Sequence, residues 1–72
     1  MSYDLDAHLA RLPAEVLEAL REPKPRARDF RRLRALQLAY ANGSARYWTR
    51  HIGEPLRRRL LERDTTNPRN DP

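Results

Sequence analysis

Residues 42–53, Asn-Gly-Ser-Ala-Arg-Tyr-Trp-Thr-Arg-His-Ile-Gly (NGSARYWTRHIG), decide how the second half of this chain folds. Asn42-Gly43 is a strong helix-stop signal, because either residue can adopt the left-handed conformation that follows a helix. Ser44 is then a good N-cap for a new helix. The side chains expected on its inner face follow helical spacing: Ala45, Trp48, Thr49 and Ile52. The stretch therefore predicts a short helix over residues 45–52, ended by Gly53.

Longer helices are predicted on both sides of this stretch. Upstream, four large apolar residues of the segment 28–42 recur with helical periodicity: Phe30, Leu33, Leu36 and Tyr40. Downstream, Pro55 suits the first turn of a last helix, because its missing N–H costs nothing there. The side chains of that helix expected to face inward are Leu56, Leu60 and Leu61. Trp48 is expected to pack in the core against Phe30, Leu33 and Leu56.

The first third of the chain predicts two short helices and a connector. The first helix has apolar spacing at Leu5, His8, Leu9 and Leu12, and Ser2, Asp4 or Asp6 is its N-cap. Pro13 opens the second helix, whose apolar face consists of Val16, Leu17 and Leu20. Pro23-Lys24-Pro25 is a stiff extended connector, because each proline disfavours helix in the residue before it.

The predicted fold class is therefore all-α: a small bundle of four or five short helices whose C-terminal half is helix-turn-helix-like. Residues 1–63 form this single domain. Residues 64–72 contain no large apolar side chain and are expected to be a disordered tail.

Size and composition restrict what such a chain can be. A domain of 72 residues is marginal, and it has no cysteine for a disulfide and too few histidines for a structural zinc site. The N-terminus is acidic where a signal peptide needs a basic start, and no run approaches about 18 apolar residues. A cytoplasmic protein without a membrane span is expected.

Charge is distributed very unevenly along the chain. Residues 24–63 contain twelve basic and three acidic residues, whereas residues 1–23 contain two basic and five acidic ones. All basic residues except Lys24 are arginines. A net charge this segregated favours a polyanion or an acidic protein surface as the partner. The N-terminal carboxylates are expected to pair with arginines within the domain.

The second half of the chain resembles the helix-turn-helix DNA-binding proteins of the Fis type. In NGSARYWTRHIG, Gly43 would start the first motif helix and Gly53 would make the turn. The following PLRRRLLER looks like the arginine-rich recognition helix of that family, with Leu56 and Leu60 facing inward. The resemblance covers residues 28–63 and implies DNA binding through the last two helices.

The candidate contact residues follow from charge and from the resemblance. Guanidinium groups suit bidentate phosphate contacts, and an aromatic ring beside them suits either a protein hot spot or a base. The predicted main contacts are Arg46, Tyr47, Arg50, Arg57, Arg58 and Arg59. Arg28, Arg31 and Arg32 are predicted to supply auxiliary phosphate contacts.

Three functions fit these features, and none is enzymatic. The first is a small transcription regulator that binds DNA, possible as a homodimer. The second is a regulator that docks on an acidic protein, since small, basic, tail-bearing chains resemble phage-encoded inhibitors of host RNA polymerase. The third is a helical module that is stable only with its partner. Neither histidine belongs to a catalytic motif, and no cofactor or metal is implied.

Overall fold

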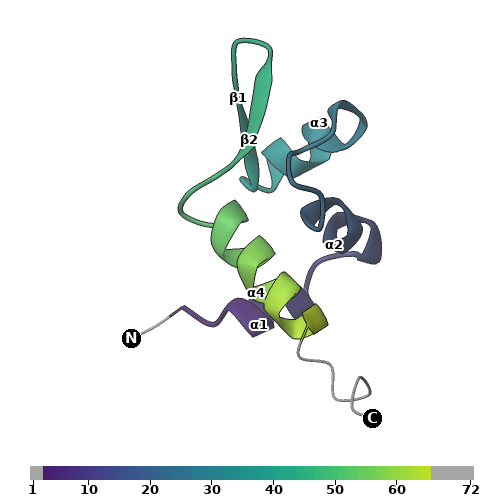
Figure 1. Cartoon of the computed structure of the whole chain (residues 1–72), viewed down its shortest axis with the longest axis vertical. Coiled ribbons are helices and arrows are strands. Elements are labelled where there is room, and N and C mark those ends of the chain that lie inside the picture. The colour runs from purple at the N-terminus through teal and green to yellow at the C-terminus, as the bar shows by residue number, and fades with distance from the viewer. Residues whose placement is uncertain (1–2, 66–72) are drawn as a thin grey trace.

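The computed structural model describes residues 3–65, which form four helices and one two-stranded antiparallel sheet (Figure 1). In chain order the elements are α1 (Leu5–Ala10), α2 (Ala14–Leu20), α3 (Ala27–Ala35), β1 (Ala39–Asn42), β2 (Ala45–Trp48) and α4 (Gly53–Thr65). The all-α prediction is wrong, because residues 39–48 form a β-hairpin where helix was expected.

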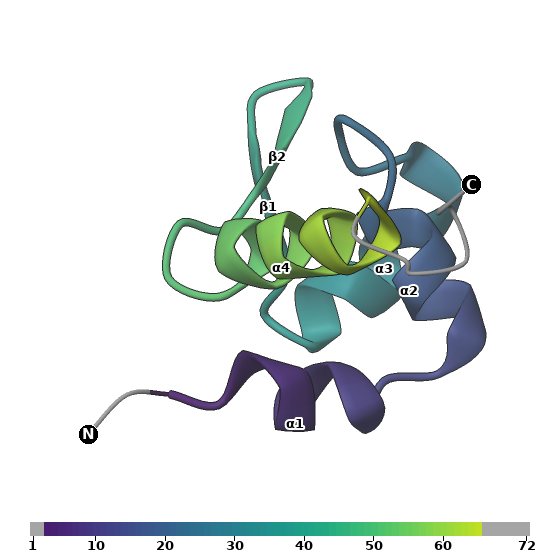
Figure 2. The same ribbon diagram turned by 60° about the horizontal axis from the view of Figure 1, so that its bottom comes forward.

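The two N-terminal helices are confirmed to within one or two residues. Among the three expected caps of α1, it is Asp4 that acts, since its side chain accepts a hydrogen bond from the Ala7 N–H at 3.1 Å. Pro13 stands at the N-cap of α2 rather than at its first helical position. Both helices pack against α4, which crosses the middle of the molecule (Figure 2).

Helix α3 ends at Ala35, seven residues before the expected stop at Asn42. Gln37 adopts a left-handed φ of 64°, and its N–H bonds to the carbonyl of Arg34 at 2.9 Å. The N–H of Leu38 bonds to the carbonyl of Leu33 at 2.8 Å, which completes a Schellman C-cap. Leu33 and Leu38 are both buried, so their contact stabilises the stop. Glycine or asparagine is usual at the left-handed C′ position, so the glutamine at residue 37 gave no sequence signal for this helix end.

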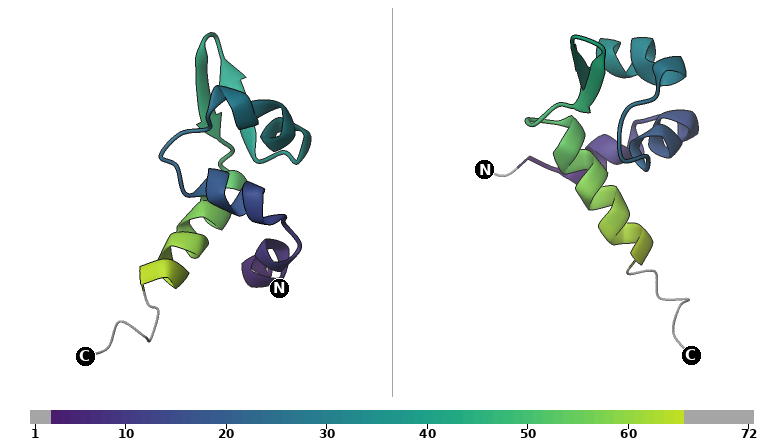
Figure 3. Two further views of the ribbon diagram at one scale, coloured as in Figure 1. Left: turned by 90° about the vertical axis from the view of Figure 1, so that its right-hand side faces the viewer. Right: turned by 45° about the horizontal axis from the view of Figure 1, so that its top comes forward.

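The hairpin follows immediately and turns at Gly43-Ser44. Asn42 lies opposite Ala45 in the register, so Gly43 and Ser44 between them form a two-residue loop. Gly43 has a φ of +66°, and Ser44 has no positive φ, which is the pattern of a type II′ turn with glycine first. The hairpin and α1 lie at opposite ends of the molecule (Figure 3).

The segment 45–52, expected as a helix, is thus strand β2 followed by a tight corner. In this corner Thr49 N–H bonds to the carbonyl of Leu38, and Thr49 Oγ1 donates to the carbonyl of Gln37. The same hydroxyl accepts the N–H of Gly53 at 2.8 Å. Gly53 therefore begins α4, where it was expected to end a helix. Helix α4 continues two residues beyond Arg63, and the rest of the expected tail lies outside the described residues.

A single apolar core joins all elements. Its largest fully buried side chains are Leu9, Val16, Leu20, Leu33, Leu38 and Leu56. Trp48 belongs to this core as expected, with Phe30 partly buried against it. Trp48 reaches the core from the hairpin, so the two strands are anchored to the helices through its ring.

Candidate nucleic-acid interface

The connector between α2 and α3 organises the polar surroundings of the hairpin. Prolines 23 and 25 provide no N–H and keep the chain extended, which leaves nearby carbonyl groups available to side chains. The indole N–H of Trp48 donates to the carbonyls of both Glu22 and Pro23 at 3.2 Å. Trp48 thus fixes β2 against the connector, and the side chains around it acquire fixed positions.

Two arginines bind the same connector. Arg57 donates from Nε to the carbonyl of Glu22 at 2.8 Å, and Arg46 donates from Nε to the carbonyl of Pro25 at 3.4 Å. The accepting carbonyls are three residues apart, which is at most about 11 Å of extended chain. These bonds orient both guanidinium groups without neutralising them, because a carbonyl carries no net charge. Within residues 3–65, neither arginine has a carboxylate at ion-pair distance.

The connector also carries a third cation, Lys24, which contacts one of two aromatic rings on the face of the hairpin opposite Arg46. Lys24 places its ammonium group 4.6 Å from the centre of the Tyr47 ring, a cation–π contact. Tyr47 lies directly opposite Tyr40 in the hairpin register, with ring centroids 5.5 Å apart. Tyr47 is half-buried and Tyr40 is 44 % exposed. We call these five residues the hairpin edge: Lys24, Tyr40, Arg46, Tyr47 and Arg57.

The three consecutive arginines of α4 do not converge on one surface. Successive helical residues project roughly 100° apart, so adjacent side chains cannot share a face. Arg57 turns to the connector, while Arg59 turns to α1 and bonds both carboxylate oxygens of Asp6, at 2.9 and 3.0 Å. Arg59 also pairs with Glu62. Arg58 is exposed between these directions, with no carboxylate of the described residues at ion-pair distance.

The other predicted contact residues are also dispersed. Arg32 forms an ion pair with Glu15, and Arg28 lies 3.9 Å from the carboxylate of Asp29, in the region between α2 and α3. Arg31 and Arg50 are exposed. Of the predicted set, the structure therefore brings Arg46, Tyr47 and Arg57 to one connector, each at a different residue of it. The N-terminal carboxylates do pair within the domain, as expected for Asp6 and Glu15.

Sequence reasoning missed the roles of Lys24 and Tyr40. Tyr40 was expected on the apolar face of a helix, and Lys24 only as part of a spacer. A Gly-Ser pair between residues suited to strands is itself a hairpin signal, and it would have placed Tyr40 opposite Tyr47. The position of Lys24 depends on a tertiary contact and has no local signal.

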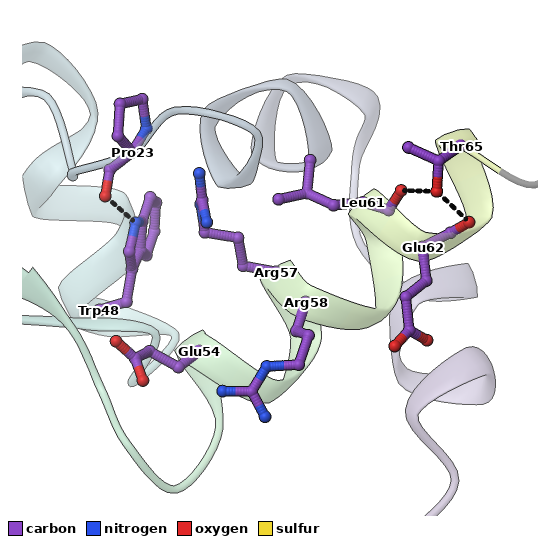
Figure 4. A pocket seen from close by; sticks show the side chains of 8 residues that line it. All are labelled: Pro23, Trp48, Glu54, Arg57, Arg58, Leu61, Glu62 and Thr65. Carbon is purple, nitrogen blue, oxygen red and sulfur yellow. Dashed lines mark hydrogen bonds between the residues drawn. The ribbon is translucent and has the colours of Figure 1, made fainter.

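A depression of about 380 Å³ borders the hairpin edge beside Trp48 (Figure 4). Its lining residues are Pro23, Trp48, Glu54, Arg57, Arg58, Leu61, Glu62 and Thr65. The two glutamates oppose the two arginines, so the depression carries little net charge. An anion is favoured at the hairpin edge, where Arg46 and Lys24 form no ion pair with any carboxylate of residues 3–65, rather than in this depression.

Two ion pairs join α4 to the N-terminal helices, Arg59 with Asp6 of α1 and Asp64 with Arg21, the C-cap residue of α2. Arg21 at the end of α2 donates to Asp64 near the end of α4 at 2.8 Å. Hydrogen bonds from Arg59 and Arg21 lower the pKa of Asp6 and of Asp64, respectively, below the ordinary aspartate value. These four residues pair with one another within the molecule and are therefore poor candidates for partner contacts.

This arrangement predicts an acid-sensitive stability. Because the folded-state pKa of each aspartate is lowered, the stabilisation is present above the unfolded pKa of about 3.9 and is lost as pH falls through the lower folded pKa. The Asp6→Asn/Asp64→Asn variant should be less stable than the wild type at pH 6 and should lose less stability on acidification to pH 3. Urea unfolding followed by Trp48 fluorescence measures this. Glu18→Gln removes a carboxylate that forms no ion pair within residues 3–65, and an equal reduction of the acid-induced loss of stability in that variant would contradict the assignment.

No group of three or more His, Asp or Glu residues within the described span is placed to hold a metal ion. None of the helices in residues 3–65 is long and apolar enough to cross a membrane. Comparison of the chain with protein-family models, with curated proteins and with solved structures gave no match. These comparisons do not bear on the resemblance to Fis-type proteins.

Proposed function

We propose that this chain is a small cytoplasmic regulator of transcription that binds DNA phosphates through the hairpin edge. The observation that carries the proposal is the state of Arg46 and Arg57. Each is oriented by a backbone carbonyl and forms no ion pair within residues 3–65, with further N–H groups of its guanidinium available for a phosphate.

The intramolecular ion pairs support the same location. Four arginines are engaged by carboxylates at 2.8–2.9 Å or closer: Arg21, Arg26, Arg32 and Arg59. The carboxylate of Glu22, at the start of the connector, forms an ion pair with Arg26. The basic residues that form no ion pair within residues 3–65 therefore include the three cations of the hairpin edge, Lys24, Arg46 and Arg57. This replaces contact through a recognition helix, because the helix expected before it is a strand.

The salt dependence of DNA binding tests the proposal. Three cations of the hairpin edge, Lys24, Arg46 and Arg57, would release about 2.7 counterions from duplex DNA if each neutralised one phosphate. We therefore expect the affinity for a fluorescein-labelled 20-base-pair duplex to fall about 40-fold between 50 and 200 mM NaCl, measured by fluorescence anisotropy. Absence of binding at 50 mM NaCl would overturn the proposal and leave an acidic protein, such as RNA polymerase, as the partner to test.

A further inference from the structure

We infer that the exposed ring of Tyr40 stacks on an unpaired base, so that the hairpin edge prefers single-stranded to double-stranded DNA. The inference rests on the proposed function, because it presumes that the cations of the hairpin edge bind phosphates, among them Lys24 beside the tyrosine pair. It names the form of DNA that the same surface recognises.

Geometry separates the two tyrosines. Tyr47 has a cation from Lys24 at 4.6 Å and the Tyr40 ring at 5.5 Å, so it is packed by two neighbours. Tyr40 has the Tyr47 ring as its neighbour, tilted by 34°, and is 44 % exposed. Tyr40 makes no side-chain hydrogen bond within residues 3–65, unlike exposed Tyr3, which bonds to His8. A large part of the Tyr40 ring is thus available to a ligand.

The place of the hairpin makes this ring reachable. The two strands project from the helical part of the molecule at one end (Figures 1 and 3). Tyr40 lies two residues from the turn, on the strand that is not held by the connector. A DNA strand bound at Lys24 would pass beside the tyrosine pair, because the Lys24 ammonium lies 4.6 Å from the centre of the Tyr47 ring. The ring offers a flat apolar surface supported from behind by Tyr47, so it would be ordered before the strand arrives.

The chemistry favours a base that is not paired. Stacking of one base on an aromatic side chain contributes about 1–3 kcal/mol and tolerates any base. In a duplex each base already stacks on its neighbours, and its faces are closed to a side chain. Cations alone bind both forms of DNA, whereas an exposed aromatic ring adds affinity only for the form with accessible base faces.

A cross-strand tyrosine pair could also serve the hairpin alone, where such a pair contributes about 0.2–1 kcal/mol of stability. The two roles differ in what the ring must retain. A stacking ring must remain aromatic but does not need its hydroxyl group. Tyr40→Phe should then bind like the wild type, whereas Tyr40→Leu, which remains apolar, should lose the base contact.

Fluorescence anisotropy at 50 mM NaCl measures the affinity for three labelled DNA probes: a single strand of 12 thymidine nucleotides, a 12-base-pair duplex, and an abasic single strand of 12 nucleotides. We expect Tyr40→Leu to weaken binding of the thymidine strand about tenfold, and to change binding of the duplex and of the abasic strand less than twofold. Tyr3→Leu, an exposed tyrosine near the other end of the molecule, is the control and should change none of them. Thermal unfolding followed by Trp48 fluorescence checks that the variants fold.

The possible failures are distinguishable. If Tyr40→Leu weakens all three probes equally, or none of them, the stacking inference is wrong while phosphate binding by the hairpin edge stands. If no probe binds the wild type at 50 mM NaCl, the proposed function fails and the inference fails with it. If the thymidine strand does not bind more tightly than the duplex, the preference for single strands is refuted.

Discussion

Gly53→Ala is expected to destabilise the fold by about 3 kcal/mol or more, the largest effect of any single substitution predicted for this chain. A Cβ atom at residue 53 would lie 2.0 Å from the carbonyl oxygen of Leu38 and 3.0 Å from its carbonyl carbon. Both are backbone atoms, and that oxygen also accepts the Thr49 N–H at 2.9 Å. The clash can be relieved only by opening the corner between the hairpin and α4. Urea unfolding followed by fluorescence of the single tryptophan, Trp48, measures the loss.

Gly43→Ala is the matched control for this prediction. Its Cβ would meet no atom within 4 Å, so the variant incurs only the cost of a left-handed φ of +66°, about 1–2 kcal/mol. A domain of this size has a total stability of roughly 4–11 kcal/mol, so the two variants should differ clearly. Equal losses in the two variants would mean that the approach of Gly53 to Leu38 does not hold the corner together.

The sequence predicted the helices that depend on local signals. Asp4 and Pro13 mark the starts of α1 and α2, and the apolar spacing of each helix was sufficient to place it. Trp48 was placed in the core correctly, although as part of the wrong element. In these cases capping, proline geometry and hydrophobic periodicity all favour the same structure, and tertiary contacts do not override them.

The hairpin was missed because its local signals were ambiguous. Leu36 and Tyr40 are four residues apart, which fits a helical face, yet the helix ends at Ala35 and the left-handed Gln37 turns the chain between them. The stop is decided by burial of Leu38 against Leu33, a packing effect that a glutamine does not signal. Asn42-Gly43-Ser44 is equally compatible with a helix end and a new N-cap. Only the tertiary structure distinguishes a helix end followed by a new helix from the two-residue loop of a β-hairpin at these residues.

The candidate site was predicted in part, for a related reason. Arg46, Tyr47 and Arg57 were selected by charge and composition, and the structure brings them to one connector. Arg59 was selected on the same grounds but is engaged by Asp6. Composition identifies cations, whereas the presence or absence of a nearby carboxylate depends on contacts between residues as far apart as 6 and 59. Such contacts cannot be read from spacing along the chain.

The second large effect is expected from the double variant Arg46→Gln/Arg57→Gln. If both guanidinium groups bind phosphates, their removal should weaken binding of the 20-base-pair duplex about 150-fold or more at 50 mM NaCl, since each charge-assisted bond contributes about 1.5–3 kcal/mol. The slope of log affinity against log salt should fall from about −2.7 to about −0.9, because Lys24 alone remains. Each substitution also removes a hydrogen bond to the connector, which lowers the free energy of unfolding by about 1 kcal/mol. Anisotropy titrations at several salt concentrations measure both quantities.

The double variant Arg11→Gln/Arg28→Gln separates site-bound charge from total charge. It also removes two positive charges, but from other places: Arg11 is at the end of α1, and Arg28 lies beside α2, near Glu15 and Glu18. A general electrostatic attraction depends on net charge and would be reduced equally in both variants. Binding at the hairpin edge requires that the control keep its slope near −2.7 and lose less than threefold in affinity. Equal losses in the two double variants would assign the binding to the overall positive charge and not to guanidinium groups oriented by the connector.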